Sequence, residues 1–243
     1  MTDNNRVVAI DVGNTSIKGG YFLNGILDTV ARFDVSNLND FYFWLNNFGE
    51  IRTVISSVVS LEHTDSIVKA VKNPMIIDVN SDTSFINLYE SKETLGIDRI
   101  CNATYINNEI QSGCAVSIDI GTCIKFDLVN EKNEYLGGSI SPGINLRYRS
   151  LNEFTGNLPL LSNKSAKKLV GNTTESSIRS GVMNGLKAEI QNLMQNYEGL
   201  YPDLTFFVTG GDAKYFELHS KNDIFADENL TIKGLFEIYM HNA

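Results

Sequence analysis

The chain contains the same strand-and-corner pattern twice, and this repeat restricts its fold more than any other feature. The first copy is VVAIDVGNTSIKGGYF at residues 7–22, and the second is AVSIDIGTCIKFDLV at residues 115–129. In each copy a short apolar run ends in one acid, Asp11 or Asp119, and a glycine corner leads into a second run. Short apolar runs between turn residues are typical of buried strands. The repeat therefore predicts two similar halves, each opening with strands joined at a sharp corner.

Strands and helices alternate through the first half of the chain. Asn24-Gly25 is a strong hairpin signal between the second and third strands. Residues 91–110 are predicted to form a turn and then a helix. The other predicted elements are strands at 7–10, 17–23, 27–34, 53–60 and 75–79 and helices at 37–48 and 62–72. This alternation favours an α/β architecture with a mixed sheet.

The second half repeats the opening order of strand, corner, strand, turn and strand. These strands are predicted at 114–119, 123–129 and 133–140. Apolar residues then recur at helical spacing over 174–197, which predicts one long helix. A buried strand ends in a Gly210-Gly211 corner, and we expect a helix to begin at Asp212.

Length and composition limit the domain organisation and the class of partner. The chain has 243 residues, and no low-complexity linker interrupts it. We therefore expect two closely joined lobes, residues 1–113 and 114–243, with a cleft between them. The net charge of −9 opposes nucleic acid as a main partner, because a phosphate backbone is bound by clustered Lys and Arg.

Cysteine usage and hydropathy point to a cytoplasmic protein. The three cysteines form no CxxC pair, so neither a disulfide framework nor a zinc site is expected. The polar start MTDNNR lacks the profile of a secretory signal. No apolar run is long enough to span a bilayer, so we expect no membrane partner.

The glycine corners suit a phosphorylated ligand. A strand that turns at glycine can direct several backbone N–H groups at one phosphate, and Asn14 and Thr15 add side-chain donors beside Gly13. Asp11 would repel a phosphate, so its expected role is to hold Mg²⁺ or its water shell. The corner at Gly210-Gly211 would admit an adenine or ribose. Alternatively, each corner is an ordinary hairpin turn. Two matching corners favour nucleotide binding.

Six motifs carry a more specific resemblance over nearly the whole chain. They are DVGNTSIKGG (11–20), LGIDR (95–99), DIGTCIKFD (119–127), GGSISPG (137–143), TTESSIRSG (173–181) and TGGD (209–212). In their order and spacing the chain resembles type III pantothenate kinase, within the actin-like ATPase superfamily of acetate and sugar kinases, Hsp70 and actin. The resemblance implies a two-lobed actin-like ATPase (ribonuclease H-like) fold, with duplicated mixed sheets flanked by helices. It also implies transfer of the ATP γ-phosphate to the primary hydroxyl of pantothenate, the first step of coenzyme A biosynthesis.

The resemblance assigns roles to individual residues. The implied ATP-binding residues are Asp11, Val12, Gly13, Asn14, Thr15, Ser16, Ile17, Lys18 and Thr122. The implied pantothenate-binding residues are Tyr89, Gly96, Ile97, Asp98, Arg99 and Thr174, with Asp98 as the catalytic base. Asp119 is the implied ligand of a monovalent cation, potassium or ammonium. The resemblance further implies a homodimer in which the second subunit completes the pantothenate pocket.

The chemistry of these residues agrees with the implied roles. Phosphoryl transfer depends on positioning and charge neutralisation, and one carboxylate at the acceptor hydroxyl, here Asp98, can accept its proton. Arg99 offers a planar fork that can orient the substrate. Alternatively, Asp98 and Arg99 are a surface ion pair at a helix start, Asp119 accepts turn amides, and Lys18 is an outward-pointing strand residue.

The sequence departs from the family pattern just after the second corner. Cys123 and Lys125 stand where the family commonly has small or hydroxyl residues. Lys125 could pair with Asp127 or Asp11, or act as a charge beside the phosphates, so the dependence on a monovalent cation stays open. Two other functions also stay open: another small-molecule kinase of the superfamily, and a nucleotide-binding regulator without kinase activity.

Overall fold

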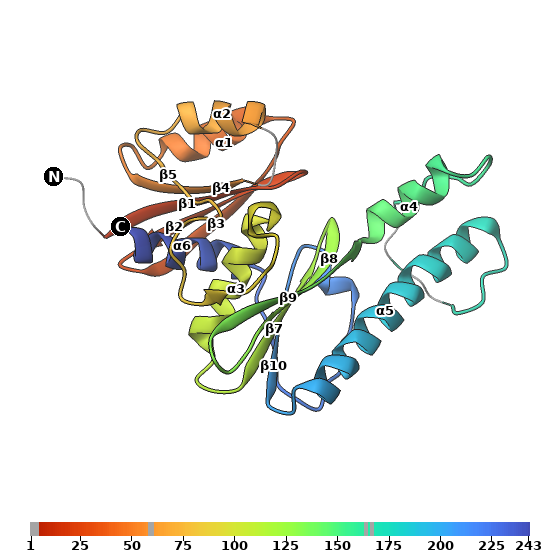
Figure 1. The fold of residues 1–243 in the computed structure, drawn as a ribbon. Coiled ribbons are helices and arrows are strands. Elements are labelled where there is room, and N and C mark those ends of the chain that lie inside the picture. Colours follow the sequence, from red (N-terminus) through yellow and green to blue (C-terminus); the bar gives the residue numbers. More distant parts are fainter. Residues whose placement is uncertain (1–4, 58–60, 163–164, 166–167) are drawn as a thin grey trace. The chain divides into compact units, whose positions relative to one another are not determined.

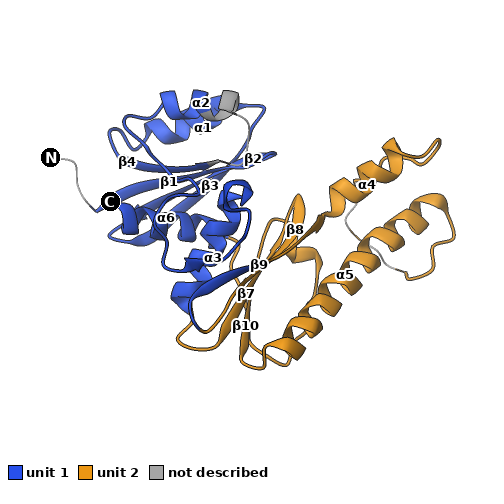
Figure 2. Cartoon of the chain, viewed as in Figure 1, with its two compact units in different colours: residues 1–109, 132–136, 229–243 blue, residues 110–131, 137–228 orange. Residues whose placement is uncertain are grey.

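The computed structural model describes residues 5–57, 61–162, 165 and 168–243, and the chain divides into two compact units (Figures 1 and 2). Unit 1 comprises Met1–Glu109, Lys132–Leu136 and Asn229–Ala243. Unit 2 comprises Ile110–Glu131 and Gly137–Glu228. The chain thus returns to unit 1 at its C-terminal end, because the last helix packs there.

Unit 1 is built on a five-stranded mixed sheet of order β3-β2-β1-β4-β5. Its strands are β1 (Arg6–Val12), β2 (Ser16–Leu23), β3 (Ile26–Asp34), β4 (Arg52–Ser57) and β5 (Met75–Ile76). β1 pairs antiparallel with β2 and parallel with β4. The predicted hairpin is confirmed, since Asn24 and Gly25 have φ angles of 52° and 81°, as a tight turn between twisted strands requires.

Helices cover both faces of this sheet (Figure 1). α1 (Leu38–Asn46) and α2 (Leu61–Lys69) lie on one face, where Phe41 and Ile67 join Val8 and Ile10 of β1 in one buried cluster. The intervening residue Ala9 is also fully buried, and α6 (Leu230–Asn242) packs against β1. A strand buried on both faces reads as a continuous apolar run, as this one does.

α3 (Ile97–Glu109) packs along α6 at close range. An ideal Cβ at Gly234 of α6 would lie only 1.9 Å from the Cys101 carbonyl oxygen of α3. A glycine inside a helix costs stability relative to alanine, and here it permits this close approach of the two backbones. α3 is thereby fixed against the sheet of unit 1.

A second mixed sheet has the order β11-β10-β7-β8-β9-β6. Its strands are β7 (Cys114–Ile120), β8 (Cys123–Val129), β9 (Glu134–Pro142), β10 (Leu204–Thr209), β11 (Ile224–Ala226) and β6 (Ile86–Asn87). β6 pairs with Glu134 and Tyr135 of β9, which unit 1 also contains. The strand–corner–strand order of unit 1 recurs here, with β7 antiparallel to β8 and parallel to β10.

The long predicted helix is confirmed as α5 (Thr174–Leu200). Its first turn is held by a capping box, in which the Ser176 N–H donates to Thr173 Oγ1 at 3.1 Å. Ile178, Leu186 and other residues of its apolar face join β7 and β8 in one buried cluster. The helical spacing in the sequence therefore predicted both the helix and its buried face.

Several elements differ from the prediction. The strand expected at 75–79 is shortened to β5, and the strand expected at 53–60 is described only to Ser57, since residues 58–60 lie outside the described part. The helix expected from Asp212 is only a 3-10 turn, Ala213–Tyr215. The turn and helix predicted over residues 91–110 are confirmed as a 3-10 turn at Lys92–Thr94 and α3. Elements that were not predicted are α4 (Ile144–Glu153), α6, β6 and β11. Within the described residues, no helix is long and apolar enough to cross a membrane.

Candidate functional site

The first corner of unit 1 holds Asp11 at a strand end between two polar neighbours. Asp11 stands opposite Lys18 of β2 and Ser56 of β4 in the sheet register. The fully buried Ser56 donates its hydroxyl to Asp11 Oδ1 at 2.9 Å. A buried donor of this kind holds the carboxylate in one orientation.

The backbone after Asp11 turns sharply. The Gly13 N–H donates to the Ser16 carbonyl at 3.0 Å and so closes the corner. Asn14 and Thr15 lie at its tip and are exposed. The corner therefore presents polar groups to solvent beside a fixed carboxylate.

Asp98 lies in the first turn of α3, and Gly96 shapes its position. The Arg99 N–H donates to Asp98 Oδ1 at 2.9 Å. An ideal Cβ at Gly96 would lie 2.5 Å from the same oxygen, so a side chain there would displace the carboxylate. Arg99 is only 4% exposed, which does not fit the alternative of a surface ion pair.

The Tyr89 ring lies against the guanidinium group of Arg99. The Arg99 guanidinium carbon lies 5.4 Å from the centre of the Tyr89 ring, within the range of a cation–π interaction. The centres of the Tyr89 and Tyr135 rings lie 6.0 Å apart. The backbone N–H of Tyr89 donates to Asn87 Oδ1 at 2.9 Å. The β6 segment thus positions Tyr89 over the start of α3.

The buried thiol of Cys101 lies within electrostatic range of both Asp11 and Asp98. Burial raises the pKa of Cys101 well above its ordinary value, and the negative charges of Asp11 and Asp98 raise it further. Both carboxylates therefore lie near the first turns of α3 in unit 1. The thiol itself is fully buried and stays protonated, so it is not a nucleophile.

In unit 2 the second corner carries an ion pair that the sequence did not predict. Asp119 of β7 stands opposite Lys125 of β8 in the antiparallel register. Lys125 Nζ lies 2.7 Å from Asp119 Oδ2, and each side chain is only 14% exposed. This pair is far better shielded from water than an ordinary surface ion pair.

The start of α4 packs directly on the second corner. The Gly143 N–H donates to the Thr122 carbonyl at 2.9 Å. An ideal Cβ at Gly143 would lie 2.1 Å from the Gly121 carbonyl oxygen and 2.6 Å from that of Thr122. Only glycine allows this approach, which explains the glycine at the end of the GGSISPG motif.

The third glycine corner packs against the same loop. Gly210 has a φ of 98°, and its ideal Cβ would lie 2.3 Å from the Ile120 carbonyl oxygen. That oxygen also accepts the Asp212 N–H at 2.9 Å. Three backbone segments distant in sequence therefore converge around the end of β7.

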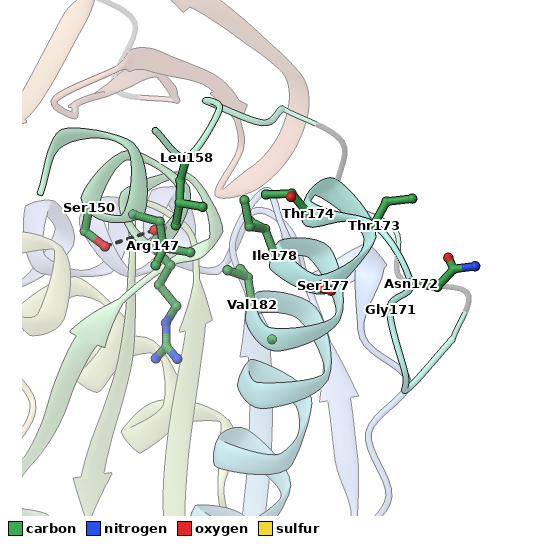
Figure 3. Close-up of a pocket in the computed structure, with 12 residues that line it drawn as sticks. Arg147, Ser150, Leu158, Gly171, Asn172, Thr173, Thr174, Ser177, Ile178 and Val182 are labelled. Atoms are coloured by element: carbon green, nitrogen blue, oxygen red, sulfur yellow. Dashed lines mark hydrogen bonds between the residues drawn. The ribbon is translucent and has the colours of Figure 1, made fainter. Parts of the chain in front are cut away.

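A cavity of about 1080 Å³ opens in unit 2 between α4 and the first half of α5 (Figure 3). Thr174 lines it and is exposed at the start of α5. Arg147 lines another part of its wall, where it contacts Glu189 at 2.5 Å and donates to the Pro142 carbonyl. Thr174 thus belongs to unit 2, whereas the other implied pantothenate-binding residues belong to unit 1.

Ser56 is a structural partner of Asp11 that the sequence analysis did not single out, because only the β1–β4 register brings it beside the first corner. Gly143 ends the GGSISPG motif, and the structure adds its contact with Thr122 at the second corner. Within the part of the chain that the structure describes, no three His, Cys, Asp or Glu side chains gather as a metal cluster.

Comparisons with known proteins agree in one family. The model of type III pantothenate kinase matches residues 7–196. The type III pantothenate kinase of Christiangramia forsetii is 38% identical over 94% of this chain and 95% of its own length.

Solved structures show the fold. A conserved protein of Campylobacter jejuni, described as a Baf family transcriptional activator, aligns with a TM-score of 0.62 and 22% identity over 97% of this chain and 98% of its own. The polyphosphate/ATP-glucomannokinase of Arthrobacter sp. aligns with a TM-score of 0.53 and 14% identity over 98% of this chain and 100% of its own. The fold is that of the actin-like ATPases and sugar kinases. From the match of the family model and the full-length likeness to its members, the chain belongs to the type III pantothenate kinase family.

Proposed function

We propose that the chain phosphorylates pantothenate on its primary hydroxyl, with ATP as donor, to give 4'-phosphopantothenate, the first step of coenzyme A biosynthesis. The observation that carries the proposal is the grouping in unit 1. The negative charges of Asp11 and Asp98 both raise the pKa of the Cys101 thiol, and Arg99 lies beside Tyr89. A kinase needs this combination of a metal-facing acid, a base and a substrate-orienting cation.

Asp98 is proposed as the general base. The Arg99 N–H and the absence of a side chain at Gly96 fix its carboxylate at the start of α3. A positioned carboxylate can take the proton of the attacking hydroxyl, and such a group contributes roughly 10²–10⁴-fold to rate. The half-buried position of Asp98 leaves part of it accessible to a substrate.

The corner from Asp11 to Lys18, together with Thr122, is proposed to bind the phosphates of ATP. Asp11 fits Mg²⁺, because a carboxylate oxygen is a hard ligand and Ser56 already orients it. Bound Mg²⁺ would supply neutralisation of the phosphate charge. The resemblance places potassium or ammonium at Asp119, and we propose that one positive charge is needed there.

The pantothenate pocket is proposed to include Tyr89, Gly96, Ile97, Asp98, Arg99 and, from a second subunit, Thr174. The homodimer is supported by large apolar side chains that lie near cavity-lining residues in the sequence and are exposed. Phe154, Leu169 and Val170 are 85%, 78% and 78% exposed, and Val170 directly precedes the cavity-lining Gly171. Large apolar side chains this exposed favour an interaction surface. The enzyme is further proposed to work in the cytoplasm.

Asp98→Asn tests the proposal. Wild-type protein should release ADP in a manner that depends on pantothenate, and the variant should lose at least about 100-fold in kcat. Its affinity for MgATP should stay within about twofold, since Asn keeps the shape of Asp. Asp28→Asn, at an exposed position of β3, is the matched control. Wild-type turnover in Asp98→Asn, or ADP release with another acceptor and none with pantothenate, would reject the proposal.

A further inference from the structure

We infer that the ammonium group of Lys125 supplies, within this chain, the positive charge at Asp119 that the family resemblance assigns to a free potassium or ammonium ion. The inference rests on the proposed function and narrows it. It makes this kinase independent of added monovalent cations, and it makes Lys125 a positioning residue of the second corner.

The ion pair is built into the sheet rather than formed by chance at the surface. The antiparallel register of β7 and β8 sets Lys125 directly opposite Asp119. Nζ and Oδ2 lie 2.7 Å apart, which is the distance of a charge-assisted hydrogen bond. With 14% exposure on each side, the pair has little water to compete with it. The ammonium is therefore held in one place.

That place is the second corner itself. An ideal Cβ at Gly121 would lie 3.4 Å from Asp119 Oδ1, so the carboxylate lies against the backbone of the corner. Gly143 and Gly210 pack on the same stretch of backbone. A positive charge on Asp119 therefore lies where three segments of unit 2 converge, beside Thr122, the residue proposed to contact a phosphate.

The residues do not fit a free cation as well as they fit the lysine. A potassium ion on Asp119 would have to share the carboxylate with Nζ, and two like charges at such short range repel strongly where water is scarce. A tethered ammonium is also present at a fixed and high effective concentration, whatever the salt in solution.

The experiment compares salts of equal ionic strength. The initial rate of ADP release with pantothenate is measured in tetramethylammonium, potassium and ammonium chloride. For the wild-type protein, we expect the rates in the three salts to agree within twofold. For Lys125→Ala, we expect at least a tenfold loss in tetramethylammonium and recovery in potassium or ammonium. A residue that only supports folding would not show recovery by these small cations.

Lys221→Ala, at an exposed position, is the control and should behave as wild type in all three salts. A wild-type rate that rises tenfold or more with potassium would overturn the inference, as would a Lys125→Ala variant that is indifferent to the salt. If that variant does not fold, the wild-type series decides.

A second measurement separates this inference from the kinase proposal. Calorimetric affinity for MgATP, without pantothenate, should be the same in tetramethylammonium and potassium for the wild-type protein. Wild-type affinity that strengthens tenfold with potassium would overturn the inference even if pantothenate were not the substrate. Absence of turnover in every salt, with a salt-independent affinity for MgATP, would reject the proposed function and leave the role of Lys125 supported.

Discussion

Replacing Gly143 with alanine adds one methyl group where α4 begins and presses it into the second corner. Gly143 has φ −74° and ψ −174°, an extended conformation that alanine adopts without strain. The substitution therefore causes no backbone penalty of its own. Its whole effect comes from the contact with the carbonyl oxygens of Gly121 and Thr122.

The size of the effect follows from the distances. The new Cβ would lie 2.1 Å from the Gly121 oxygen, against about 3.4 Å for an ordinary contact, so one backbone segment must move. Overpacking of this kind costs roughly 1–3 kcal/mol. The hydrogen bond from the Gly143 N–H to Thr122, now 2.9 Å, would be strained or lost, at about 0.5–1.5 kcal/mol. Together we expect a loss of about 1.5–4.5 kcal/mol in the free energy of unfolding.

Two assays follow this change. Denaturant unfolding should show the lost free energy, and calorimetry should show MgATP binding at least about tenfold weaker, because the displaced segment is the one proposed to contact a phosphate. Gly185→Ala is the matched control. An ideal Cβ there meets nothing within 4 Å, and alanine should stabilise α5 by about 0.5–1 kcal/mol. A Gly143→Ala protein with wild-type stability and wild-type MgATP affinity would refute the reasoning.

Two other substitutions test unit 1. Ser56→Ala removes the buried donor to Asp11 Oδ1, so the Mg²⁺ concentration that gives half-maximal activity should rise several-fold. An unchanged Mg²⁺ dependence would show that Ser56 does not orient Asp11. Burial raises the pKa of Glu237 from 4.5 to about 7, because the folded protein favours the protonated carboxyl group. The contribution of this group to the free energy of unfolding is therefore fully present below pH 4.5 and is lost as the pH rises through 7. Glu237→Gln should flatten the fall in the free energy of unfolding between pH 5 and 8, whereas Glu217→Gln, at an exposed position, should leave it unchanged. Equal slopes in the wild-type protein and in Glu237→Gln would contradict the assignment of this fall to Glu237.

The sequence predicted the elements whose side-chain pattern is strong. β1 and β7 have short, nearly continuous apolar runs, α5 has an apolar face at helical spacing, and Asn24-Gly25 makes a turn of a known type. α4 was missed because few apolar residues mark it, with Ile144 and Tyr148 alone fully buried. β6 and β11 are too short to show alternation.

The partners of the candidate residues depend on register, which local patterns do not reveal. Lys125 faces Asp119 because β7 and β8 pair with that offset, and a slip of one residue would turn the lysine to the other face of the sheet. Ser56 reaches Asp11 for the same reason through β4. The sequence motifs indicate the candidate site residues, but only the sheet register shows which side chains bind to them.

The most direct test of the account is the identity of the phosphorylated product. Purified protein is incubated with MgATP and pantothenate in tetramethylammonium chloride, and the product is examined by phosphorus NMR and mass spectrometry. The account predicts one phosphate monoester on the primary hydroxyl of pantothenate, formed in equal amount with ADP. ADP without that ester, or an ester on the secondary hydroxyl, would contradict it.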